Sequence, residues 1–169
     1  HIGLELRGAR VAVQGFGAVG KHAARFLAEK GAVLVAASDT RGTLLDQGGI
    51  DVAALIKLKD EGKSVVDYAK GEKLAADAIL GIACEIWIPA ARPDVVRADN
   101  VDRLKARLVL QGANIPITEQ AEAVLHARGV VSVPDFIANA GGVICAAAEF
   151  HGGSESGAFA LIGERIRAN

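Results

Sequence analysis

The segment of this chain best suited to chemistry is GFGAVG, which occupies residues 15–20. Its glycines follow the G-x-G-x-x-G spacing, directly after the apolar run 11–13 and at the start of a segment with helical periodicity. Gly15 would permit a tight turn, Gly17 would let the backbone approach a pyrophosphate, and Gly20 would let helix and strand pack closely. Free N–H groups and the positive end of the helix dipole would favour the anion.

A carboxylate follows this turn at a spacing typical of dinucleotide-binding units. Asp39 lies about twenty residues beyond Gly20, at the end of the second apolar run, where it could hold the hydroxyls of an adenosine ribose. Glycine-rich turns are common, and the glycines alone also fit a strand-to-helix connection that needs small residues. Together with Asp39, they favour dinucleotide binding.

The choice between NAD and NADP depends on the neighbours of Asp39. A carboxylate that accepts ribose hydroxyls would repel a 2′-phosphate, so Asp39 favours NAD. Thr40 and Arg41 could accept a 2′-phosphate, although a solvated loop position explains Arg41 more simply. We therefore expect NAD as the cofactor and leave NADP open.

The elements that must position these residues follow from hydrophobic periodicity. Short apolar runs, typical of strands buried on both faces, occupy residues 11–13, 33–37, 86–88, 108–110 and 130–133. Segments with helical spacing lie between them. This alternation predicts the α/β class, with a doubly wound, mostly parallel sheet and helices on both faces.

Capping signals mark the ends of three predicted helices. The helix after the glycine turn should end at Gly31. The next should begin after Asp51 and end at Gly62, and the third should begin after Thr118 and end at Gly129.

The remaining segments give weaker signals. Residues 63–82 fit neither period, so their structure is left open. Residues 137–150, rich in alanine and glycine, predict a tightly packed helix, and an amphipathic segment occupies 159–166. The chain stops without a capping signal, so we expect it to be part of a longer protein.

Composition bounds the class of protein. The chain has 169 residues, 51% of them apolar, which suits one globular domain. Its net charge is −1 with lysine and arginine spread along the chain, so we expect neither nucleic acid nor a membrane as partner. Cys84 and Cys145 are interpreted as small buried hydrophobes in a reducing compartment. Without a targeting or membrane-spanning segment, we expect a cytoplasmic protein.

Three later motifs follow in order along the chain: IPAA at 88–91, QGAN at 111–114 and PDFIANAGGV at 134–143. The first two follow predicted strands, and the carboxyl ends of strands are where doubly wound sheets bind ligands. Taken singly, each has a simpler interpretation as a strand terminator or a turn.

Taken together, VAVQGFGxVG, SDTRG, IPAA, QGAN and NAGGV closely resemble the cofactor-binding domain of the glutamate/leucine/phenylalanine/valine dehydrogenase family, over essentially the whole chain. The resemblance implies a modified Rossmann domain over residues 1–169, C-terminal to a substrate domain that this chain lacks. The parent enzyme would be a homo-oligomer. It would oxidatively deaminate an L-amino acid to a 2-oxo acid and ammonia, with hydride transfer to C4 of the nicotinamide.

The resemblance also implies which residues bind the cofactor. The pyrophosphate would lie along Gly15, Phe16, Gly17, Ala18, Val19 and Gly20. Asp39 would lie at the adenosine ribose with Thr40 beside it, and the nicotinamide and its ribose would be surrounded by Ala90, Ala91, Asn114 and Asn139.

Two positions depart from the family pattern. Ala18 stands where members commonly have asparagine, so one polar contact with the cofactor is lost. Ala146 stands near the place of a serine that helps glutamate-specific members bind the substrate's side-chain carboxylate. Glutamate stays the expected amino acid, with branched-chain and aromatic amino acids as alternatives.

The catalytic groups of the family, a lysine in a glycine-rich segment and an aspartate, belong to the missing substrate domain. Lys21, Lys30 and Asp135 offer no replacement and are interpreted as solvated or structural charges. We therefore expect no catalytic residue and no metal site in this chain, which would bind nucleotide at most. The alternative is a non-catalytic NAD-sensing regulatory module with the same fold.

Overall fold

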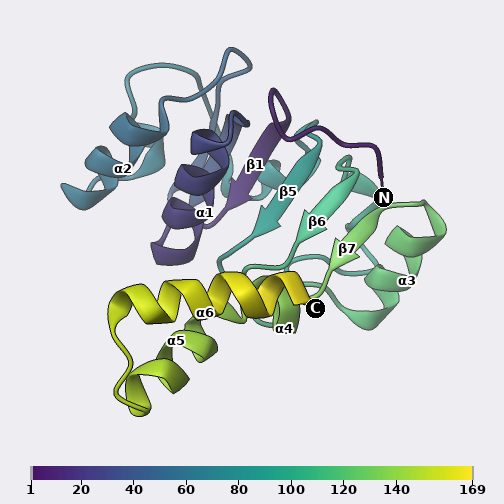
Figure 1. The fold of residues 1–169 in the computed structure, drawn as a ribbon. Coiled ribbons are helices and arrows are strands. Elements are labelled where there is room, and N and C mark those ends of the chain that lie inside the picture. The colour runs from purple at the N-terminus through teal and green to yellow at the C-terminus, as the bar shows by residue number, and fades with distance from the viewer. Residues whose placement is uncertain (1, 169) are drawn as a thin grey trace.

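The computed structural model describes residues 2–168, so both ends of the predicted domain, His1 and Asn169, lie outside it. Seven strands form one sheet in the order β4-β3-β2-β1-β5-β6-β7. Figure 1 shows β1, β5, β6 and β7 side by side. The strands in the parallel part are β1 (Arg10–Gln14), β2 (Val33–Asp39), β5 (Ile86–Pro89), β6 (Leu108–Leu110) and β7 (Val131–Val133). These are the strands that the apolar runs predict, so the α/β class and the mostly parallel sheet are confirmed.

Two antiparallel strands complete one edge of the sheet. β3 (Gly42–Leu45) pairs with β2, and β4 (Glu72–Leu74) pairs with β3. Residues 63–82, whose structure the sequence left open, consist of β4 between two short 3-10 helices, η1 (Val65–Asp67) and η2 (Ala76–Gly81). Elements this short complete no period, which explains the unreadable pattern.

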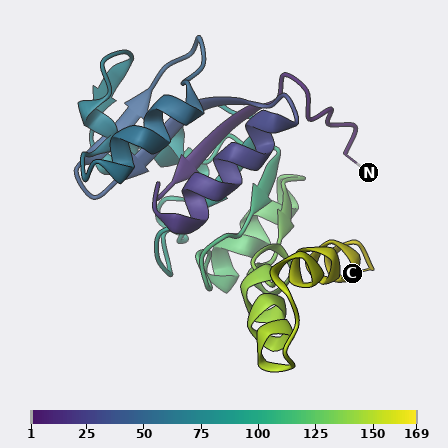
Figure 2. The ribbon, with the colours of Figure 1, turned by 60° about the vertical axis from the view of Figure 1, so that its left-hand side comes forward.

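Helical layers cover both faces, as predicted. On one face α1 (Ala18–Glu29) and α2 (Val52–Asp60) pack over side chains such as Val11 and Val13. On the other, α3 (Glu119–Ala127) joins η2 and η3 (Val101–Arg103) over the alternate residues of the strands. Figure 2 shows α1 lying along the sheet.

The predicted helix caps are present. The side chain of Asp51 accepts a hydrogen bond of 3.0 Å from the Ala54 N–H at the start of α2. That of Thr118 accepts one from the Ala121 N–H at the start of α3. Each of the three helices ends two residues before its predicted glycine.

The C-terminal segment differs from its prediction. It consists of α4 (Asp135–Ala138), α5 (Gly141–Phe150) and α6 (Glu155–Ala168), which lie beyond the carboxyl ends of the strands (Figures 1 and 2). Residues 137–150 do contain a helix, α5, but its predicted tight packing is wrong. No residue of α4 or α5 is buried, and Phe150 is 87% exposed. α5 packs on α6 instead of on the sheet.

The two cysteines differ in burial in the same way: the one in the core is buried and the one in the C-terminal segment is not. Cys84 is buried in the core just before β5, and this burial raises the pKa of its thiol to about 12, as expected for an inert hydrophobe. Cys145 lies on α5 and is only partly buried, so its predicted burial is wrong. Within residues 2–168, no helix combines the length and apolarity that crossing a membrane requires.

Candidate functional site

A cavity of about 910 Å³ lies at the carboxyl ends of β1, β2 and β5. η2 and the segment that follows β5 complete its wall. The predicted site residues that line it are Gly15, Phe16, Gly17, Asp39, Thr40, Ala90 and Ala91. Of the other predicted residues, Ala18, Val19 and Gly20 form the first turn of α1 beside it. Two more, Asn114 and Asn139, are not part of its lining.

The three glycines of the turn have different surroundings. Gly15 has φ +91°, and a Cβ there would come within 2.7 Å of the Ala91 Cβ, so this turn is pressed against the IPAA motif. A Cβ on Gly20 would overlap the carbonyl oxygen of Gly15, which confirms the close packing of helix on strand. Gly17 faces open space on the cavity wall. The turn is therefore closed on its protein side and open on its cavity side.

The start of α1 is suited to an anion. Gly17 is the N-cap, no side chain caps the helix, and its first turn carries no acidic residue. Phe16, only 1% exposed, anchors the preceding turn in the core. The partial positive charge of the helix start is thus left without a protein counter-charge, at the edge of the cavity.

Asp39 lies at the end of β2, as predicted, but its carboxylate is already engaged. Oδ2 accepts hydrogen bonds from Lys59 Nζ (2.7 Å) and the Val65 N–H (2.9 Å). Oδ1 accepts them from Ser64 Oγ (2.8 Å) and the Arg41 N–H (3.0 Å). An ionised carboxylate offers about four acceptor positions, and these four donors fill them.

These bonds set the acidity of Asp39. Burial raises its pKa, but the hydrogen bonds from Lys59, Val65, Ser64 and Arg41 outweigh it and lower the pKa to about 2. The side chain of Arg41 is exposed in the turn after β2, as its interpretation as a solvated loop residue predicts, and it forms a surface ion pair of 2.7 Å with Asp67.

Lys59 and Ser64 are functional neighbours that sequence reasoning missed. Lys59 belongs to the last turn of α2 and lines the cavity, and Ser64 precedes η1 in the segment without a readable period. The only available signal was the position of Lys59 at the end of a predicted helix, which says nothing about its contact with Asp39.

The two predicted asparagines contact each other. Asn139 Nδ2 donates a hydrogen bond of 2.8 Å to Asn114 Oδ1, which joins the loop after β6 to the end of α4. Behind this loop, the buried Gln111 of the same motif donates to Ser132 Oγ (3.0 Å) and to Glu122. The QGAN motif is thus held by side chains from α3, β7 and α4.

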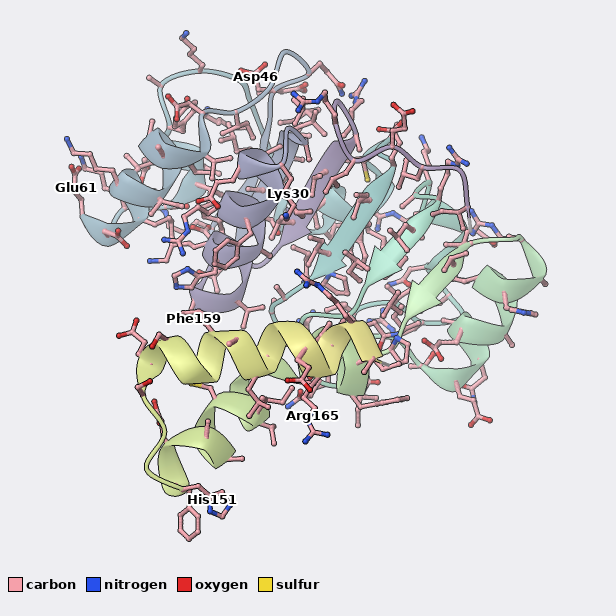
Figure 3. The ribbon with its side chains drawn as sticks, in the orientation of Figure 1. Lys30, Asp46, Glu61, His151, Phe159 and Arg165 are labelled. Atoms are coloured by element: carbon pink, nitrogen blue, oxygen red, sulfur yellow. The ribbon has the colours of Figure 1, made fainter. Side chains whose placement is uncertain are left out.

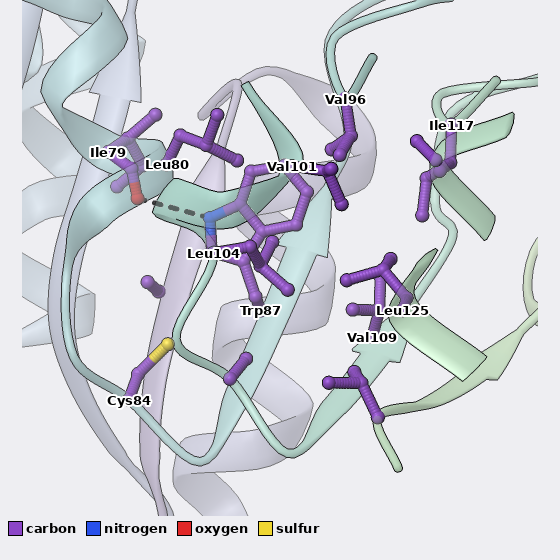
Figure 4. Close-up of a cluster of buried hydrophobic side chains, with 14 of the residues drawn as sticks. Ile79, Leu80, Cys84, Trp87, Val96, Val101, Leu104, Val109, Ile117 and Leu125 are labelled. Carbon is purple, nitrogen blue, oxygen red and sulfur yellow. Dashed lines mark hydrogen bonds between the residues drawn. The ribbon is translucent and has the colours of Figure 1, made fainter. Parts of the chain in front are cut away.

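The floor of the cavity belongs to the core. Ile79, Leu80 and Trp87 line the cavity and are all buried, and Trp87 Nε1 donates a hydrogen bond of 3.1 Å to the Ile79 carbonyl oxygen (Figure 4). The single tryptophan therefore reports directly on this wall.

The other charged side chains discussed in the sequence analysis form structural contacts or are exposed. Lys21 forms an ion pair with Asp60 of α2, and Asp135 accepts a hydrogen bond from the Ile115 N–H. Lys30 is exposed at the end of α1 (Figure 3). Across residues 2–168, no group of three or more histidine, cysteine, aspartate or glutamate side chains is arranged to hold a metal ion.

Sequence comparison places this chain among dehydrogenases. The profile of the Glutamate/Leucine/Phenylalanine/Valine dehydrogenase family matches residues 1–160. A glutamate dehydrogenase of Aeropyrum pernix is 47% identical over 139 residues, which is 82% of this chain and 33% of that protein. An NADP(+)-dependent glutamate dehydrogenase of Pyrobaculum calidifontis is 48% identical over 144 residues, 82% of this chain and 34% of that protein. The chain thus spans about a third of the length of these relatives.

Solved structures share the fold. The hetero-hexameric glutamate dehydrogenase of Thermus thermophilus, in a leucine-bound form, has a TM-score of 0.76 and 28% identity, covering 97% of this chain and 47% of that one. The glutamate dehydrogenase of Plasmodium falciparum has a TM-score of 0.83 at 21% identity, covering 96% and 38% of the two chains.

Proposed function

Because this chain belongs to the glutamate/leucine/phenylalanine/valine dehydrogenase family, we propose that it is the C-terminal NAD(P)-binding domain of an amino-acid dehydrogenase. The parent enzyme would oxidatively deaminate an L-amino acid to a 2-oxo acid and ammonia. The observation that carries the proposal is the glycine turn, closed against Ala91 and Val13 on its protein side and open at Gly17.

The residues present fit a dinucleotide. Gly17 and the uncapped start of α1 would hold the pyrophosphate, because free N–H groups and the helix dipole meet it there. Asp39 and Thr40 would face the adenosine ribose, and Ala90 and Ala91 the nicotinamide half. The bound nicotinamide supplies the hydride acceptor, while this chain binds and orients it and the substrate domain brings the amino acid.

NAD is the proposed cofactor, and one observation supports NADP as the second candidate. The acceptor positions of Asp39 are filled, so ribose hydroxyls would have to displace Ser64 or Lys59. Lys59 lines the cavity and could pair with a 2′-phosphate. Related proteins named NADP-specific or NADP(+)-dependent, from Saccharolobus shibatae and Pyrobaculum calidifontis, support the same candidate.

Glutamate is the proposed substrate, supported by the names of the relatives. Ala146 on α5, which stands near the place of a serine in glutamate-specific members, keeps branched-chain and aromatic amino acids as alternatives. We also propose that the parent is a homo-oligomer that works in the cytoplasm.

Titration with NADH and NADPH, each followed by quenching of Trp87 and sensitised nicotinamide emission, tests the proposal. We expect saturable binding of at least one nucleotide. The variant Gly17→Ala should stay folded, because its Cβ meets no protein atom, yet bind more weakly because that Cβ enters the space of the pyrophosphate. Lys59→Ala should weaken NADPH more than NADH if NADP is the cofactor.

Two results would contradict the proposed function. If the chain gives a folded circular dichroism spectrum but neither nucleotide produces energy transfer or calorimetric heat, nucleotide binding by this domain is wrong. If it binds nucleotide but the longer parent shows no dehydrogenase activity, the NAD-sensing module is the better function.

A further inference from the structure

Within residues 2–168, two residues other than glycine have a positive φ, Asp94 at +52° and Ile115 at +46°. Left-handed backbone is unfavourable for any L-residue with a Cβ and most unfavourable for a β-branched residue such as isoleucine. Such strain persists only where surrounding contacts impose it. Both residues follow motifs of the predicted site, Asp94 after IPAA and Ile115 after QGAN.

The two strained residues contact each other. The Asp94 N–H donates a hydrogen bond of 3.0 Å to the Ile115 carbonyl oxygen, and the Val95 N–H donates one of 2.9 Å to Pro116. A parallel bridge between Val96 and Ile117 extends the pairing. The loops that follow β5 and β6 are therefore paired along their backbones, and the backbone of Ile115 lies at the junction.

Asp135 holds this junction from a third segment. As the first residue of α4, it accepts a hydrogen bond of 2.8 Å at Oδ2 from the Ile115 N–H, and one of 2.7 Å at Oδ1 from the Phe136 N–H. The Asn139–Asn114 hydrogen bond joins the same two segments.

Apolar packing does not explain how Ile115 is held. Its side chain is 66% exposed, Phe136 beside Asp135 is 72% exposed, and α4 has no buried residue. The strained conformation therefore depends on polar contacts, and the carboxylate of Asp135 supplies the contact to the Ile115 N–H itself.

We propose that Asp135 is a positioning residue for the nicotinamide half of the site. By holding Ile115 in its left-handed conformation, it fixes the paired loops that carry Ala90, Ala91 and Asn114. This inference rests on the proposed function, since it assigns those loops to the nicotinamide. A role limited to capping α4 through the Phe136 N–H would leave the loops unaffected.

A double-mutant cycle separates the two roles. Asp135→Ala removes the contact, and Ile115→Gly removes the need for it, because glycine adopts a positive φ freely. Asp135→Asn, which keeps one acceptor oxygen, serves as the milder variant. NADH binding is followed by sensitised emission from Trp87, and ADP-ribose binding by calorimetry reports on the adenosine half alone.

We expect Asp135→Ala to weaken NADH binding about tenfold, the loss of roughly one charge-assisted hydrogen bond, and to leave ADP-ribose binding nearly unchanged. In the Ile115→Gly background the same substitution should have little effect on NADH. Equal weakening in both backgrounds would overturn the proposal, as would unchanged NADH binding in Asp135→Ala.

Amide hydrogen exchange provides a readout that needs no nucleotide. The Ile115 N–H should lose its protection in Asp135→Ala, and retained protection would overturn the proposal. Absence of any NADH and ADP-ribose binding by the wild-type chain would instead refute the proposed function and, with it, the assignment of these loops to the nicotinamide.

Discussion

The two halves of the sheet's carboxyl edge are built in different ways. Around β1 and β2, the glycine turn is fixed by backbone contacts, and four donors surround the partly buried Asp39. Around β6 and β7, exposed segments are joined by single side-chain hydrogen bonds, with strain at Ile115. Phe150 is exposed in the hairpin of α5 and α6 beyond them. Phe159 of the same hairpin is also exposed (Figure 3).

This difference implies that one half of the site is rigid and the other is adjustable. The half that would hold the adenosine and pyrophosphate is formed in advance by packing. The half that would hold the nicotinamide depends on a few polar contacts, so it can adjust with small changes in free energy.

Gly20→Ala should produce the largest loss. Its Cβ would overlap the Gly15 carbonyl oxygen, a backbone atom that cannot move without opening the turn, so we expect about 3 kcal/mol or more of destabilisation. Urea unfolding measures it, and Gly17→Ala is the matched control with no steric conflict. Similar midpoints for the two variants would contradict the packed turn.

Asp39→Asn should destabilise the fold by about 2 kcal/mol at neutral pH, since the lowered pKa reflects donors that stabilise the carboxylate. In the wild type, this stabilisation should be complete above the unfolded pKa of 3.8 and be lost as the pH falls towards 2. Unfolding curves between pH 2 and 6 provide the measurement. The exposed carboxylate of Asp99, paired with Arg97, offers Asp99→Asn as a control with a much smaller effect.

Asp51→Ala should cost about 1 kcal/mol, because the first turn of α2 would lose its side-chain cap. Thermal unfolding followed by circular dichroism measures the change. Thr118→Ala at the start of α3 should behave alike, and a loss confined to one of them would mean that the caps are not equivalent.

Phe150→Ser should change the free energy of unfolding by no more than about 0.5 kcal/mol, because this side chain on α5 is exposed. Leu55→Ala, at a fully buried position of α2, should cost at least about 2 kcal/mol in the same urea titration. A comparable loss for both would show that the C-terminal hairpin is part of the cooperative core.

The strands and helices that form the buried core are the parts of the molecule best predicted from the sequence. Apolar runs and capping residues such as Asp51 are local signals, and the structure confirms them. β3 and β4 escaped prediction because antiparallel strands of only three or four residues produce no long apolar run. The packing of α5 was mistaken because an alanine-rich segment is equally apolar whether it faces the sheet or another helix.

For the site, the sequence predicts positions better than contacts. It indicates that Asp39 ends a strand, but Lys59 and Ser64 reach it from elements distant along the chain. The family resemblance predicts that Asn114 and Asn139 both surround the nicotinamide, but neither lines the cavity, and their mutual hydrogen bond depends on where α4 ends. The left-handed backbone of Ile115 has no local signal, since isoleucine is among the residues least suited to it.

The pairing of β1 with β5 has a consequence for biosynthesis. β1 lies at the centre of the sheet and pairs with β2 on one side. Its other side pairs with β5, which begins only at Ile86. As the ribosome releases the chain, β1 can pair at once with β2, but its other row of N–H and C=O groups stays unpaired until β5 emerges. Over that interval the nascent chain carries an open hydrophobic edge, and a pause in translation before Ile86 would prolong its exposure to aggregation.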